Sequence, residues 1–275
     1  MTGPLDESSA DVHSGALAAD DLVVGFDGSP TSVDALALAT PLARLWKVGL
    51  RVVTVHQPVV LGGRRSEEDR ELAAARCARD GASRLGAGVR LSWGEHRAAD
   101  VVAGLHTAAV TSAGLVVGRP RPRVSDRGFH RTVLEDAPVP VALARRHLLP
   151  HPALRHVVLG LTGEGSDTID VLLAFAGRLR HLQDVLVTVA GLDAGVGSGF
   201  LADAVFQVGG ALGRRARGAV LPARDAARRW DGDELVVCVG RPRGAHGHQG
   251  ADAVERILLA EDGPSLLVLP PTAVS

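Results

Sequence analysis

Short apolar segments recur along the chain and are separated by longer segments with the spacing of helices. In the first half the apolar segments lie at residues 22–26, 50–55, 89–93, 115–117 and 139–143. Apart from the weaker third segment, they are continuous apolar runs, which is typical of strands buried on both faces of a parallel sheet. The second half repeats the order with apolar segments at residues 157–161, 185–189, 235–239 and 266–269.

Helical spacing and good helix formers fill the gaps between the strands of the first half. The predicted helices cover residues 32–46, 67–85, 98–112 and 125–136. On the first of them, one stripe is expected to face the core and consists of Val33, Leu36, Ala37, Ala39, Thr40 and Ala43. Ser32 or Thr31 is expected to cap its start. Strands that alternate with helices predict a doubly wound α/β fold.

The two halves share enough features to indicate an internal duplication. The best anchor is the run Val-Gly-Arg-Pro-Arg, which follows a predicted strand at residues 117–121 and again at 239–243. Gly25 likewise matches Gly160. A basic, proline-containing stretch near residue 150 interrupts both patterns. We therefore predict a disordered tail, a first domain, a linker and a second, degenerate domain at residues 1–20, 21–146, 147–153 and 154–272.

Composition places the chain among soluble globular proteins. Its 275 residues, 46% of them hydrophobic, suffice for two domains of about 100–150 residues each. Basic residues number 30 and acidic residues 31, so no overall field attracts nucleic acid or an anionic membrane surface. Two cysteines give no disulfide framework, no apolar run is long enough to cross a membrane, and the acidic start does not resemble a signal peptide. We expect a cytoplasmic protein that binds neither nucleic acid nor membranes.

The first candidate site lies where the first predicted strand ends. In an open parallel sheet, ligands bind beyond the carboxyl ends of the strands, where the strand order reverses. Asp27 follows the first strand directly, and Gly28 and Ser29 are expected to form a tight turn into the helix. Two interpretations remain open. Asp27 accepts hydrogen bonds from a ligand hydroxyl or amine, or it caps the turn.

The second candidate site is the basic loop that begins at Gly118. Five arginines crowd this loop, at positions 119, 121, 123, 127 and 131, and Pro120 and Pro122 remove backbone donors from it. Guanidinium groups can grip a phosphate through paired hydrogen bonds, so the loop is a candidate anion site. A basic loop that is merely solvated is the alternative.

Taken together, residues 23–29, Gly118 and residues 133–141 resemble the universal stress protein family. The resemblance spans roughly residues 20–146 and, more faintly, 154–270. It implies two tandem Rossmann-like domains of the adenine nucleotide alpha hydrolase-like type. Each would be a five-stranded parallel sheet of order 3-2-1-4-5 with helices on both faces. It also implies a role in stress adaptation and, in many members, pairing through the last strand.

Members that bind ATP share a loop of the form Gly-x2-Gly-x9-Gly-Ser/Thr after the fourth strand. Gly118 matches its first glycine, whereas the remaining glycines are replaced or shifted, and Thr162 stands where the first half has Asp27. By this resemblance, Val55 lies near the adenine position. The nucleotide-contact candidates are Asp27, Gly28, Ser29, Val55, Gly118, Arg121, Gly128, Thr132 and Gly240.

Other chemistries find little support in the sequence. His246 and His248 are the closest histidine pair, but two histidines on a glycine-rich loop rarely form a metal site without further ligands. Residues 25–29 lack the Gly-x-Ser-x-Gly elbow of a hydrolase. Three dispersed tryptophans and no tyrosine give no platform for stacking bases. We expect no catalytic residues and no metal.

Two functions follow from these observations. The first is a regulatory stress-response protein whose halves form an internal pseudo-dimer and which acts through protein partners, with weak or lost nucleotide binding. A homodimer is a further expectation. The second is an ATP-binding sensor that uses Asp27, Gly118 and the loop arginines. An ATP-hydrolysing enzyme is disfavoured because no general base or metal ligands are placed to activate water.

Overall fold

The computed structural model describes most of the chain. The described ranges are 21–58, 64–85, 88–119, 129, 132–134, 137–148, 154–162, 166–192, 195–220, 234–240 and 263–270. The predicted tail lies outside these ranges, as do most of the predicted linker and most of the helix expected at 125–136. No helix of the described part is long and apolar enough to cross a membrane.

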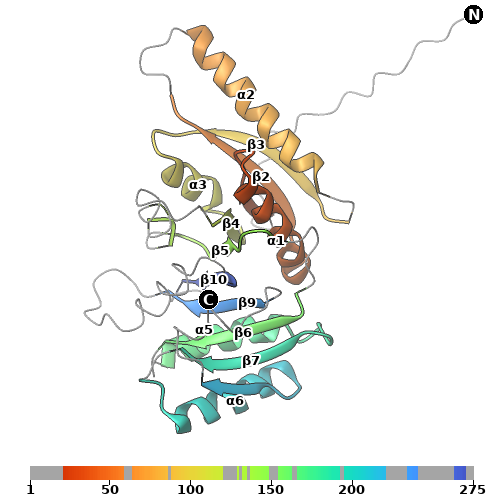
Figure 1. Cartoon of the computed structure of the whole chain (residues 1–275), viewed down its shortest axis with the longest axis vertical. Helices are drawn as coiled ribbons and strands as arrows, with labels where there is room; N and C mark the ends of the chain where they lie inside the picture. The colour runs from red at the N-terminus through yellow and green to blue at the C-terminus, as the bar shows by residue number, and fades with distance from the viewer. Residues whose placement is uncertain are drawn as a thin grey trace, which may run out of the picture.

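The first half alternates strands and helices as predicted (Figure 1). Its elements are β1 (Asp21–Gly25), α1 (Pro30–Trp46), β2 (Gly49–His56), α2 (Arg64–Ser83), β3 (Leu91–Arg97), α3 (Val101–Ala109), β4 (Gly114–Gly118) and β5 (Val141–Ala144). The weak apolar segment at 89–93 marks β3 poorly, since that strand begins at Leu91 and runs to Arg97. β3 ends the sheet, and its Leu91 and Trp93 are 38% and 43% exposed, so no continuous apolar run is needed there.

The second half repeats this plan. Its elements are β6 (His156–Leu161), α5 (Ser166–Arg178), β7 (Leu186–Gly191), α6 (Ser198–Leu212), β8 (Arg217–Val220), β9 (Glu234–Val239) and β10 (Ser265–Leu269). The four apolar segments expected there form β6, β7, β9 and β10. The short strand β8 at the other end of the sheet is an additional element, and most of its side chains are exposed.

All ten strands join in one sheet of order β3-β2-β1-β4-β5-β10-β9-β6-β7-β8. Within each half neighbouring strands are parallel and follow the predicted order 3-2-1-4-5. The halves meet where β5 pairs with β10 in antiparallel fashion, Ala142 lying opposite Leu267. The chain therefore forms an internal pseudo-dimer through the last strand of each half, as the resemblance implies.

Two apolar cores lie on opposite faces of the sheet, as the continuous runs predict. Successive residues of β1 enter different cores: Leu22 and Val24 pack on one side and Val23 on the other, and all three are fully buried. The first core includes side chains of α1, α2, α5 and α6, and the second includes those of α3. The described helices thus cover both faces, which gives the layered shape seen in Figure 1.

Helix α1 differs from the prediction in its cap and its buried face. Ser29 is the N-cap, because its Oγ accepts a hydrogen bond from the Ser32 backbone N–H at 3.2 Å and Pro30 opens the helix. The expectation of a Ser32 or Thr31 cap is wrong. Val33 is 36% exposed, so the predicted stripe is also partly wrong. Since α1 packs across β1, β4 and β5, its buried face is wider and includes Leu38 and Leu42.

Candidate functional site

The candidate crevice of the first half lies at the carboxyl ends of β1 and β4. These neighbouring strands are paired in parallel, with Val24 opposite Val116, and the chain leaves β1 toward β2 on the far side. This is the point where the strand order reverses, the usual ligand position in such sheets. The structure brings Asp27, Gly28 and Gly118 to this end of the sheet, as predicted from the sequence.

Asp27 caps the turn that leads into α1. Its Oδ1 accepts a hydrogen bond from the Ser29 backbone N–H at 2.9 Å, and Gly28 between them adopts a φ of 80°, which favours glycine. Partial burial raises the pKa of the Asp27 carboxyl, but hydrogen bonds from Ser29 and Ser32 outweigh that effect and hold it below its ordinary value. Asp27 is therefore an exposed carboxylate at neutral pH.

Gly118 is held by the contact of β4 with the first turn of α1. A Cβ at this position would lie 1.9 Å from the Thr31 carbonyl oxygen and 2.4 Å from its carbonyl carbon. No side chain can occupy that space unless the backbone moves. The packing of α1 against β4 thus requires this glycine independently of any ligand.

At the end of β2 the structure places Val55 beside α3. Val55 is half-buried, and a Cβ at Gly104 would lie 2.7 Å from its Cγ1. The next residue, His56, is buried, and within the described part its Nδ1 has no hydrogen-bond partner. Sequence reasoning missed His56, because a lone histidine at the end of an apolar run carries no motif. Burial, reinforced by Arg51 and His56, lowers the pKa of His96 on the adjacent strand.

Arg119 does not belong to an open basic loop. It is 2% exposed, and its Nη2 donates a hydrogen bond to the Pro264 carbonyl at 2.8 Å. Burial lowers the pKa of its guanidinium to about 10, and Arg146 and Arg145 act in the same direction. The side chain is still protonated at neutral pH and links the end of β4 to the start of β10. The first arginine of the predicted anion loop therefore joins the two halves of the protein.

The remaining loop candidates are only partly described. Arg121 and Gly128 lie outside the described residues, together with Arg123, Arg127 and Arg131. Thr132 is described and exposed. The structure therefore brings Asp27, Gly28, Ser29 and Gly118 to the carboxyl ends of β1 and β4, and Val55 lies at the end of β2, the strand next to β1.

At the corresponding position of the second half, a buried leucine takes the place of Val55. Gly25 pairs with Val53 and Gly160 with Ala190, so Leu192 occupies the register position of Val55. Leu192 is 1% exposed, and a Cβ at Gly160 would lie 2.4 Å from its Cδ1. Leu192 therefore covers the end of β6.

Two further residues of that half also make internal contacts. Thr162, which takes the place of Asp27, is 4% exposed. Gly240 donates its N–H to the Leu269 carbonyl at 2.8 Å, and a Cβ there would lie 3.1 Å from Val268. His246 and His248 lie outside the described residues, and among the described ones no cluster of three or more His, Cys, Asp or Glu could hold a metal.

Comparison with known proteins supports the fold. No protein-family model matches the sequence, and no curated protein matches it either. A solved structure of a universal stress protein from Archaeoglobus fulgidus is similar with a TM-score of 0.70 and 14% identity, over 92% of this chain and 97% of that one. A putative universal stress protein from Pseudomonas aeruginosa is similar with a TM-score of 0.59 and 14% identity, over 91% and 93% of the two chains.

A third solved structure, a protein of unknown function from Pseudomonas aeruginosa, has a TM-score of 0.60 and 16% identity, over 92% of each chain. All three matches extend over both halves of this chain. The chain therefore has the fold of the universal stress proteins in a two-half arrangement.

Proposed function

We propose that this chain is a universal stress protein-like cytoplasmic regulator that acts mainly through protein partners and has weak or lost nucleotide binding. The observation that carries the proposal is Arg119, the first cation after β4, which binds the Pro264 carbonyl inside the molecule. A phosphate at the crevice would not meet this guanidinium. The buried Leu192 in the second crevice supports the same conclusion.

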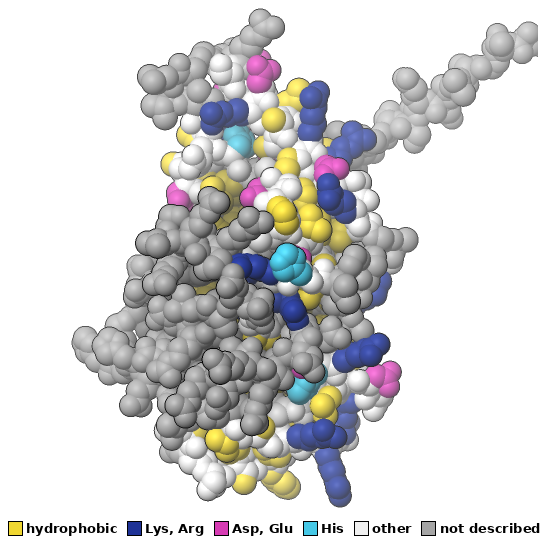
Figure 2. Space-filling view, viewed as in Figure 1, with side chains coloured by type: hydrophobic (Ala, Val, Ile, Leu, Met, Phe, Trp, Pro, Cys, Tyr) yellow, Lys and Arg dark blue, Asp and Glu magenta, His cyan; other side chains and the backbone are white. Residues whose placement is uncertain are grey.

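Exposed apolar side chains support the role of protein contacts. Phe206 on α6 is 81% exposed and Val220 on the neighbouring β8 is 65% exposed. Contiguous exposed apolar patches mark surfaces that bind other proteins, and we propose that these two side chains belong to such a patch. The face shown in Figure 2 otherwise scatters basic and acidic side chains among apolar ones, in keeping with a net charge of −1.

A second function, an ATP-binding sensor, rests on Asp27. This exposed carboxylate lies at the strand-order reversal, and its lowered pKa keeps it ionised, so it can accept hydrogen bonds from ribose hydroxyls or an amine. Gly28 and Gly118 leave the backbone beside it without side chains. In this function the arginines beyond Arg119 would hold the phosphates.

Calorimetric titration with ATP, with and without magnesium, separates the two functions. The informative variant is Asp27→Asn, because an asparagine oxygen can still accept the Ser29 N–H that closes the turn. Asp203→Asn is the matched control, since Asp203 is an exposed residue of α6 in the other half. Saturable binding that Asp27→Asn abolishes and Asp203→Asn preserves would establish the sensor. No heat up to millimolar ATP from folded protein would support the partner-mediated role.

We further propose that the chain does not hydrolyse ATP as its function. The described crevice residues offer one exposed carboxylate and no adjacent metal ligands, whereas hydrolysis needs an activated water. Phosphate release measured over hours in the presence of magnesium tests this. Turnover that Asp27→Asn removes would overturn the proposal.

A further inference from the structure

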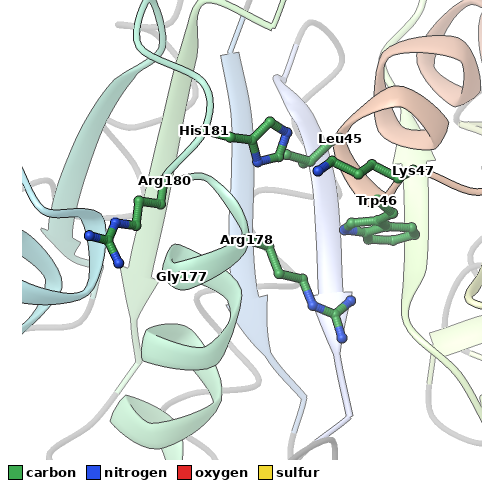
Figure 3. A pocket seen from close by; sticks show the side chains of 7 residues that line it. All are labelled: Leu45, Trp46, Lys47, Gly177, Arg178, Arg180 and His181. Carbon is green, nitrogen blue, oxygen red and sulfur yellow. The ribbon is translucent and has the colours of Figure 1, made fainter.

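A basic groove lies between the C-terminal ends of α1 and α5, where the two halves meet (Figure 3). It has a volume of about 540 Å³ and is open to solvent. Lys47 reaches it from the end of α1, and Arg178 and His181 reach it from the end of α5. Each half contributes one wall, so the groove exists only in the joined molecule. It is separate from the crevice of Asp27.

The described side chains that line the groove concentrate positive charge. Lys47 and His181 point toward each other across it, whereas Arg178 points away from them, with its guanidinium below Trp46 in the view (Figure 3). Arg180 points away instead, and its guanidinium lies beside Gly213. Among the described residues, no lining residue is Asp or Glu, and neither Lys47 nor Arg178 forms an ion pair. Such a cluster stands out in a chain whose net charge is −1.

An apolar cavity adjoins the basic groove. A second cavity of about 390 Å³ shares Trp46 and Arg178 with the first. Its other described lining residues are all apolar, Val171 and Phe175 of α5 among them. The Nε1 atom of Trp46 is buried, and within the described part it has no hydrogen-bond partner. A donor in that position is costly to leave unsatisfied, so it points to a missing acceptor.

Helix electrostatics account for only part of this arrangement. Cations near helix C-termini interact favourably with the helix dipole, which explains one basic residue at the end of each helix. That effect does not explain the adjoining apolar cavity or the buried indole N–H. An elongated molecule with a negative head and an apolar body would interact with the basic residues, the apolar cavity and the buried indole N–H together.

We propose that this groove binds an amphipathic organic anion, with its carboxylate between Lys47 and Arg178 and its apolar body against Val171 and Phe175. The Trp46 indole N–H then donates to the carboxylate or to a polar atom next to it. A small amphipathic anion is favoured by charge complementarity and by the position of the apolar cavity beside the basic groove, with which it shares Trp46 and Arg178. It does not depend on nucleotide binding at the Asp27 crevice.

Decanoate is the probe, and Trp46 is the reporter. The chain has three tryptophans, so Trp93→Phe with Trp230→Phe leaves Trp46 as the sole emitter in the full-length protein. We expect a saturable change in its emission with decanoate below the micellar range, and a weaker response to the uncharged decanol. Arg178→Gln should weaken decanoate binding by about tenfold or more, since a hydrogen bond to a charged group is lost. Arg76→Gln, an exposed site on α2, should leave it unchanged.

Three outcomes would overturn the proposal. Equal affinity for decanoate and decanol would mean that the cations do not recognise the head group. Absence of both an emission change and calorimetric heat would mean that the groove binds no such anion. The third outcome is a change in Trp46 emission, in the absence of decanoate, when Asp6, Glu7 and Asp11 are replaced with their amides. That change would mean that the chain's own acidic start occupies the groove.

Discussion

Replacing Gly118 with alanine tests whether packing or ligand binding requires the glycine. The added Cβ would lie 1.9 Å from the Thr31 carbonyl oxygen and 2.4 Å from the carbonyl carbon. Both are backbone atoms of the first turn of α1 and cannot rotate aside. Overpacking that side chains can relieve costs about 1–3 kcal/mol, so we expect a loss of about 3 kcal/mol or more here. For a chain of this size, that loss lowers the melting temperature by on the order of 6–12 °C.

Thermal and urea unfolding followed by circular dichroism measure this effect. Gly94→Ala is the matched control, because Gly94 lies in β3 and a Cβ there would meet nothing within 4 Å. We expect this control to be neutral or slightly stabilising. Equal unfolding midpoints for Gly118→Ala and Gly94→Ala would refute the packing argument. A Gly118→Ala protein of normal stability that no longer binds ATP would assign the glycine to a ligand.

Three further predictions concern the turn and the seam between the halves. Arg119→Met removes the hydrogen bond to the Pro264 carbonyl, and we expect urea unfolding to show a loss of about 2 kcal/mol. Ser29→Ala removes the N-cap of α1 and should cost about 1 kcal/mol in the same assay. The folded-state pKa of Asp27 is depressed, so its contribution is present above the ordinary value of 3.8 and is lost as pH falls below it. The stability difference between the wild type and Asp27→Asn should therefore shrink on acidification below that value.

Each of these predictions has an outcome that would contradict it. An Arg119→Met protein as stable as the wild type would mean that the seam does not depend on this contact. A Ser29→Ala protein with unchanged stability would mean that another residue caps α1. A difference between wild type and Asp27→Asn that stays constant across the acid range would show that the turn does not favour the ionised carboxylate.

The architecture was predictable because burial on two faces leaves a clear signature. Strands such as β1 must supply apolar side chains to both cores, so the sequence of each is an uninterrupted apolar run. The edge strands lack this constraint. The apolar pattern displaced β3 and did not mark β8, which only the five-stranded sheet of the resemblance implied, since most side chains of both are exposed. The periodicity of α1 failed at Val33 because the helix packs across several strands rather than one.

The candidate site was predictable only where contacts are local in sequence. The link from Asp27 to Ser29 spans two residues, and the turn chemistry indicates it. Arg119 and Pro264 are 145 positions apart, so no local pattern distinguishes this internal contact from a phosphate ligand. Leu192 is likewise matched to Val55 only through strand register. The groove at Lys47 and Arg178 requires knowledge of how the two halves are joined.

The antiparallel pairing of β5 with β10 has a consequence for symmetry. It makes the strands of the two halves point in opposite directions across the seam, so their carboxyl ends face opposite margins of one slab. One margin carries the exposed carboxylate of Asp27, and the other carries the buried Leu192. The two halves share one plan of strands and helices, yet these margins are unlike. A partner that binds at the margin of Asp27 therefore meets a different surface from a partner that binds at the margin of Leu192.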